Sequence, residues 1–228
     1  MKVVVFKEAK EFSRAQSQLK PLQVLKCPAI SIREKKMAAL TGEFDFLLVT
    51  SANALRFVRN RPKVKTVVAI GAETSASIRL KSGEKLKVLK ESHAGGVLKF
   101  FKSKKSARIL YLRGSLSRRL GDKRLVPGLK KWGHSLKIVE TYQTRILNIR
   151  SPLLKILKAK SPEFLFLTSP SMVEAFRKSF TLKEMRSFKT QWIAIGPTTL
   201  KAAKRLKIKA LIPPQASLKA MKKLALRS

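Results

Sequence analysis

Short apolar runs alternate along the chain with longer stretches in which apolar residues recur at helical spacing. Such runs, bounded by Gly, Pro, Ser or Asn, are typical of buried strands, and the stretches between them, such as the one through Phe12, Ala15 and Leu19, are typical of amphipathic helices. The alternation predicts an α/β protein built on parallel sheets. The expected strands cover residues 3–6, 22–25, 44–49, 67–70, 86–89, 108–112, 138–144, 164–167, 192–195 and 210–212.

Part of this pattern occurs twice. The segment VTSANALRFV at 49–58 is similar to LTSPSMVEAF at 167–176, and AIGAETSASIRLK at 69–81 is similar to AIGPTTLKAAKRL at 194–206. The copies lie 118 and 125 residues apart, much farther than the roughly 20 to 50 residues of a solenoid repeat. The spacing therefore predicts two domains of similar build.

The expected strands are unevenly distributed, because few of them lie after residue 147, where the second copy of the pattern is found. Adding the N-terminal strands, which we expect to close at Pro28, makes the two sheets similar in size. We therefore predict a discontinuous terminal domain (1–28 and 148–228) and a middle domain (36–137). Segments 29–35 and 138–147 would then form a two-stranded connector, and two like domains would enclose a cleft.

The charge is extreme, with 51 Lys and Arg against 13 Asp and Glu and a formal net charge of +38. Such a field attracts polyanions, including nucleic acid, but does not define a specific partner. The sequence contains no recognition helix, zinc finger or aromatic stacking platform that would indicate a dedicated nucleic-acid binder. We interpret the lysines as a solvated cationic surface with nonspecific adhesion to nucleic acid as a side effect.

Targeting and metal-binding signals are also missing from the sequence. The chain has no apolar run near the ~20 residues that span a bilayer, and its first apolar run is too short for a signal peptide. We therefore expect a cytoplasmic protein, and a monomer. The single Cys27 excludes an internal disulfide, and together with the separated His93 and His134 it forms no zinc pattern, so we expect no metal.

Candidate binding groups lie where strands hand over to helices. In a parallel sheet these corners share one edge, and each offers backbone N–H groups, the positive end of a helix and a hydroxyl, which together suit anions. The alternative is that these hydroxyls only cap their own helices, which is the commonest use of Ser and Thr there. The predicted anion-binding residues are Ser51, Thr74, Ser169, Thr198 and Thr199.

These blocks, with ILYLRG (109–114), VETYQT (139–144) and FLFLTSPSMVEAF (164–176), resemble the uroporphyrinogen-III synthase family in order and spacing. The resemblance implies two α/β domains joined by a two-stranded connection. It also implies a cofactor-free lyase of tetrapyrrole, porphyrin and heme biosynthesis. This enzyme would convert linear hydroxymethylbilane, which carries eight carboxylates, into uroporphyrinogen III in the cleft, with loss of water and inversion of the last pyrrole ring.

The resemblance also assigns roles to individual residues. Tyr142 matches the family's tyrosine that assists departure of the hydroxyl, and it is the predicted catalytic residue. Arg113 and Arg118 are further candidates, because guanidinium groups can pair with propionates bidentately; their alternative is a solvated surface position. The competing hypothesis for the whole chain is a noncatalytic two-domain protein that binds a small anion or RNA.

Overall fold

The computed structural model describes residues 1–89, 94–117 and 122–228. The chain forms two compact units. Unit 1 consists of Met1–Ser31 and Arg145–Ser228, and unit 2 of Ile32–Thr144. Both units are α/β, with the strands inside each unit paired in parallel, so the predicted fold class is confirmed at this level.

Unit 1 has the strand order β10-β9-β8-β1-β2. Its strands are β1 (Lys2–Glu8), β2 (Gln23–Glu34), β8 (Phe164–Leu167), β9 (Gln191–Ala194) and β10 (Ala210–Leu211). Its helical segments are η1 (Ala9–Glu11), α1 (Phe12–Leu19), α7 (Arg150–Lys160), α8 (Pro170–Ser179), α9 (Leu182–Ser187), α10 (Pro197–Arg205) and α11 (Leu218–Ala225).

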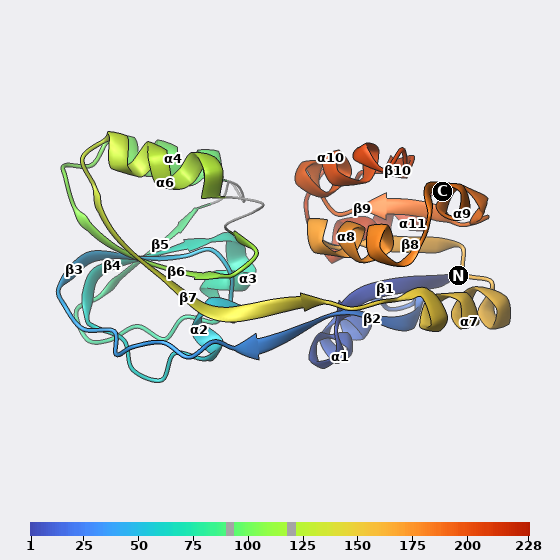
Figure 1. Cartoon of the computed structure of the whole chain (residues 1–228), viewed down its shortest axis with the longest axis horizontal. Helices are drawn as coiled ribbons and strands as arrows, with labels where there is room; N and C mark the ends of the chain where they lie inside the picture. The colour runs from blue at the N-terminus through green and yellow to red at the C-terminus, as the bar shows by residue number, and fades with distance from the viewer. Residues whose placement is uncertain (90–93, 118–121) are drawn as a thin grey trace. The chain divides into compact units, whose positions relative to one another are not determined.

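Alternating side chains of this sheet bury both of its faces. Val4 and Phe6 of β1 pack with residues of α7, α8, α9 and α10, while Val3 and Val5 pack with residues of α1 and α11. Successive strand residues point to opposite faces, so a strand that is apolar throughout must be covered twice. Figure 1 shows α8 and α10, in orange and red, next to β8 and β9.

Unit 2 has the strand order β7-β6-β3-β4-β5. Its strands are β3 (Phe44–Val49), β4 (Val64–Ile70), β5 (Lys85–Leu89), β6 (Arg108–Gly114) and β7 (Ser135–Ile146), and its helices α2 (Asn53–Arg56), α3 (Gly71–Ser75), α4 (Ala94–Lys102) and α6 (Asp122–Lys131). Leu48 and Tyr111 pack under α4 and α6, which lie together over the sheet in Figure 1, whereas Leu47 and Leu112 pack on the side of α2.

The two sheets share one layout although their strands follow in a different chain order. β2-β1-β8-β9-β10 in unit 1 corresponds to β7-β6-β3-β4-β5 in unit 2, and the repeated sequence blocks follow corresponding strands. The agreement extends to register, because the β1–β2 pairing shifts between Lys7 and Glu8 and the β6–β7 pairing shifts between Arg113 and Gly114. This correspondence supports the duplication inferred from the sequence.

Each expected strand overlaps an observed one, but β2 and β7 are longer than predicted, at 12 residues each. Pro28 does not close β2, which continues to Glu34. Proline lacks an N–H and is tolerated in a sheet where pairing is irregular, and Pro28 lies at the register shift between β1 and β2. Both long strands contain a boundary between the units. No helix among the described residues is long and apolar enough to cross a membrane.

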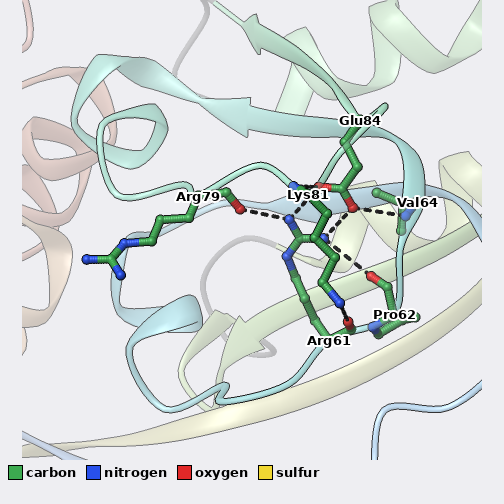
Figure 2. A network of polar contacts seen from close by, with 6 residues as sticks. All are labelled: Arg61, Pro62, Val64, Arg79, Lys81 and Glu84. Carbon is green, nitrogen blue, oxygen red and sulfur yellow. Dashed lines mark hydrogen bonds and ion pairs between the residues drawn. The ribbon is translucent and has the colours of Figure 1, made fainter.

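A buried ion pair fastens the loops at the amino ends of β4 and β5. Arg61 donates to both carboxylate oxygens of Glu84 at 2.6 Å, and the backbone N–H groups of Val64 and Lys81 donate to the same carboxylate at 3.0 and 2.7 Å (Figure 2). Arg61 also donates to the Arg79 carbonyl at 2.9 Å. Burial opposes ionisation of Glu84, but these donors outweigh it and lower its pKa from 4.5 to about 2.

We expect Glu84→Gln to lower the free energy of unfolding by about 3 to 5 kcal/mol, because it leaves the buried Arg61 charge without its carboxylate. Since the folded pKa lies below the unfolded value, the contribution is present above pH 4.5 and is lost as the pH falls toward 2. Urea unfolding at several pH values measures both effects.

The matched control is Glu43→Gln, which breaks the exposed pair between Glu43 and Arg108. Its cost should stay below about 1 kcal/mol, because exposed ion pairs contribute little. Equal losses in the two variants would contradict a structural role for the buried pair.

Candidate active site

The carboxyl edge of the unit 2 sheet contains a topological switch point. From β3 the chain moves outward to β4 and β5 and then returns to the other side of β3 with β6 and β7. The connections that leave β3 and β6 therefore diverge, and ligands of open α/β sheets bind in the crevice that this creates. Ser51 follows β3 and Ser115 follows β6, so these residues flank the switch point.

A β-bulge at Thr141 aims Tyr142 at this edge. Arg113 pairs with Glu140 and the next residue, Gly114, pairs with Tyr142, so Thr141 is the extra residue. Strict alternation would put Val139 and Thr141 on one face, but the bulge puts Val139 and Tyr142 there instead, both packed in the apolar cluster of Leu112. Tyr142 is only 9% exposed.

The tyrosine ring lies directly against the backbone of Gly114. A Cβ atom at Gly114 would lie 2.4 Å from Cζ of Tyr142 and 2.7 Å from its hydroxyl oxygen. The Tyr142 carbonyl accepts a hydrogen bond from Ser115 N–H at 3.0 Å. Only glycine at the end of β6 permits so close an approach. The contact with the Gly114 backbone therefore fixes the position of the Tyr142 ring at the edge of the sheet.

The bulge residue also connects Tyr142 to the corner after β3. Thr141 Oγ1 donates a buried hydrogen bond of 2.8 Å to the carbonyl of Ala54 in α2. The Ser51 hydroxyl accepts from Asn53 N–H at 3.3 Å and so has a local role in the turn. Thr74, which is 6% exposed, lies in the corner after the neighbouring strand β4. The structure therefore brings Ser51, Thr74 and Tyr142 to one edge of unit 2.

On the other face of β7 from Tyr142, a carboxylate links two cations. Glu140 accepts hydrogen bonds from Lys35 and, at 3.2 Å, from Arg113. The hydrogen bond from Lys35 lowers the Glu140 pKa, against the opposing effect of burial, and the Arg113 charge adds to it. The Arg113 side chain is 8% exposed, and its guanidinium group is directed at Glu140. Glu140 therefore stays ionised and connects β7 to β6 and to Lys35, the residue that follows β2.

Unit 1 places its predicted residues at the carboxyl edge of its own sheet. Ser169 is the N-cap of α8 but makes no side-chain cap bond; its hydroxyl lies 2.8 Å from that of Ser171. Thr198 and Thr199 are in the first turn of α10, the former exposed and the latter 2% exposed. The first N–H groups of a helix have no intrahelical acceptor, so both corners can bind anions.

The duplication shows that the two edges are chemically unequal. By register, Ile30 in unit 1 corresponds to Tyr142, since each is the residue after its bulge, and Lys7 corresponds to Arg113. Both edges thus keep the anion-binding corners, but only the edge of unit 2 carries a side chain that can donate a proton at this position. The two copies therefore share a strand layout but differ at the residue after the bulge, which is Ile30 in unit 1 and Tyr142 in unit 2.

Arg118 lies outside the described residues. The sequence pattern did not identify Lys35, Glu140 or Gly114, although Glu140 lies in VETYQT (139–144) and Gly114 in ILYLRG (109–114). Their roles depend on pairing between β2, β6 and β7, which no local pattern encodes. Among the residues that the structure describes, no group of three His, Cys, Asp or Glu side chains could hold a metal ion.

Comparisons with known proteins concern the family and the overall fold. The family model described as uroporphyrinogen-III synthase HemD matches residues 11–223. A mutant uroporphyrinogen III synthase from the extremely thermophilic bacterium Thermus thermophilus is 14% identical with a TM-score of 0.65, covering 100% of this chain and 98% of that one. Uroporphyrinogen-III synthetase from Helicobacter pylori is 22% identical with a TM-score of 0.64, covering 100% and 99%. No curated protein sequence matches.

We expect Gly114→Ala to destabilise the protein by about 1 to 3 kcal/mol, because the new methyl group overlaps the Tyr142 ring. Urea unfolding of Gly114→Ala alone and in a Tyr142→Ala background separates this contact from general strain. In the second background the ring is gone, so the added methyl should cost much less. The same cost in both backgrounds would show that the ring does not determine the need for glycine.

Proposed function

The chain belongs to the uroporphyrinogen-III synthase family, and from this we propose how its residues carry out the family's reaction. That reaction is the cyclisation of linear hydroxymethylbilane to uroporphyrinogen III, and it makes the protein a lyase of tetrapyrrole and heme biosynthesis. The bond between the terminal carbon and its hydroxyl breaks, water is released, and the ring closes with the last pyrrole inverted.

We assign the proton donor for the departing hydroxyl to Tyr142. The observation that carries this assignment is the clamped position of its ring at the switch point, against Gly114 and beside Ser115. Phenols keep their proton at neutral pH and can therefore donate a hydrogen bond as the carbon–oxygen bond lengthens. The pyrrole nitrogen of the substrate donates electron density toward the terminal carbon as the carbon–oxygen bond breaks. The proton donor therefore need not be strongly acidic.

The substrate carboxylates are held by the strand-to-helix corners at Ser51, Thr74, Ser169, Thr198 and Thr199. A carboxylate gains about 0.3 to 1 kcal/mol from a helix N-terminus and about 1.5 to 3 kcal/mol from each charge-assisted hydrogen bond. Several corners acting on eight carboxylates hold a flexible chain in one shape. The net charge of +38 speeds the capture of this anion by long-range attraction.

Shape control is the harder part of the reaction, because closure without ring inversion competes. Holding the reacting ends together contributes up to about 7 to 11 kcal/mol in favourable cases. A hundredfold preference between two ring carbons needs only about 2.7 kcal/mol between their transition states. Fixed corners with modest individual energies are therefore sufficient for selectivity.

Arg113 is committed to Glu140, since its guanidinium group is nearly buried against that carboxylate. Lys35, which is half exposed on the other side of Glu140, is the better placed of the two cations to meet a propionate. We also propose that units 1 and 2 are the two domains of the enzyme, and that it acts without a cofactor, as a monomer in the cytoplasm. Family membership favours this enzyme over a noncatalytic anion- or RNA-binding protein.

Tyr142→Phe should lower kcat by about 100-fold and leave KM within about threefold, because only the departing hydroxyl loses its donor. The assay is incubation with fresh hydroxymethylbilane, oxidation and chromatographic separation of the type I and type III products. The chain has two tyrosines, so Tyr111→Phe, in the core under α4 and α6, is the matched control and should keep its activity. Unchanged turnover in Tyr142→Phe would reject the donor role. No type III product from the parent protein would favour the noncatalytic alternative.

Thr198→Glu should raise KM by about tenfold with a small effect on kcat, because a fixed negative charge at the start of α10 repels a substrate carboxylate. Thr198→Ala should change KM by less than about threefold, since backbone N–H groups provide most of the binding. Ala159→Glu, exposed on α7, changes the net charge equally and serves as the control in the same steady-state assay. A similar rise of KM in this control would mean that net charge alone determines binding.

A further inference from the structure

A concave site lies at the amino edge of the unit 1 sheet. A cavity of about 830 Å³ opens where β9 begins at Gln191, where β10 begins at Ala210, and where α10 ends. The anion-binding corners of Ser169 and Thr198 lie at the other ends of these parallel elements. The cavity is therefore separate from the proposed substrate corners of unit 1. Its size lies within the range of about 300 to 1,000 Å³ that is typical of small-molecule sites.

The walls of the cavity are apolar and include aromatic rings. Met185, Phe188, Trp192, Ile208 and Leu211 contribute to them. The centroid of the Trp192 ring lies 6.2 Å from that of Phe188, on which it is stacked, and 4.7 Å from that of Phe176, which it meets edge to face. These two contacts fix the orientation of the Trp192 ring. An aromatic ligand entering the cavity would meet preoriented rings in the offset or edge-to-face geometries that aromatic groups prefer.

The rim of the cavity is cationic. Lys204, Lys207, Lys209 and Arg186 line it, all four are exposed, and none of the lining residues is acidic. The end of α10 arranges two of the lysines, because Ile208 N–H bonds to the Ala203 carbonyl and Lys207 N–H to the Lys204 carbonyl. This is a Schellman motif, with Lys207 in the left-handed conformation at φ 55°. The turn places Ile208 in the wall and leaves the lysine side chains at the mouth.

One residue of the wall has a polar atom that forms no hydrogen bond within the described part of the chain. Thr190 Oγ1 is buried and has no hydrogen-bond partner there. A buried hydroxyl without a partner costs free energy that a ligand with an acceptor atom would recover. An apolar pocket with one such hydroxyl and several cations at its mouth has the composition of a site for a small organic anion.

We propose that this cavity binds a small amphiphilic aromatic carboxylate, with its rings against Trp192 and Phe188 and its acid group among Lys204, Lys207 and Lys209. The site is independent of the cyclisation reaction, because it uses none of the residues assigned to that reaction. The charge at the rim excludes aromatic cations, and the apolar walls disfavour small inorganic anions, which would leave them exposed to water.

The probe for the test is anilinonaphthalene sulfonate, an aromatic anion whose fluorescence rises in apolar surroundings. The chain has two tryptophans, so a Trp132→Phe protein retains Trp192 as the only one. Bound probe in the cavity should quench Trp192 emission by energy transfer, with a saturable one-to-one titration. Phenylnaphthylamine, a similar ring system without the acid group, should bind about tenfold more weakly or worse.

The variant for the test, Lys204→Glu with Lys209→Glu, should raise the Kd of the probe by about tenfold or more. The control, Lys158→Glu with Lys160→Glu, makes the same change of net charge on the exposed side of α7 and should alter the Kd by less than about twofold. Thermal unfolding confirms that both variants fold. Equal Kd values in the two variants, or probe binding without quenching of Trp192, would overturn the proposal.

Discussion

The proposed active site depends on one steric constraint, the contact between the Tyr142 ring and the bare backbone of Gly114. The bulge at Thr141 turns the tyrosine onto the apolar face, and the missing side chain at Gly114 lets it lie flat at the end of β6. Loss of the bulge at Thr141, or a side chain at position 114, would move the phenol away from the switch point. The proposed donor is therefore positioned by packing and strand pairing rather than by an ion pair.

Electrostatics acts around this contact at two scales. The excess of lysine and arginine creates a diffuse field that recruits anions, whereas the few carboxylates make local connections. Glu84 fastens the amino-end loops of unit 2, and Glu140 joins Lys35 and Arg113 at β7. In a chain so rich in cations, an ionised carboxylate readily finds a partner. Glu84 and Glu140 both serve structure in this way.

In the proposed mechanism, the duplicated topology separates binding from chemistry. Both units carry the same strand layout and the same type of strand-to-helix corner, but the residue after the bulge is Ile30 in one and Tyr142 in the other. A second use of unit 1, at the amino edge of its sheet, is compatible with this division because parallel sheets have two chemically different edges. The carboxyl edge receives helix N-termini, while the amino edge receives helix C-termini and loops.

The sequence by itself determined the α/β class, the position of the strands, the duplication and the resemblance to a family, because hydrophobic periodicity and repeated blocks are local properties of the chain. It also identified Tyr142 and the corner residues as candidates. It did not reveal that β2 continues past Pro28, that Thr141 is a bulge, or that Lys35, Glu140 and Arg113 meet. These features arise from register between strands distant in sequence, and pairing register is decided by tertiary packing, so only the folded structure could show them.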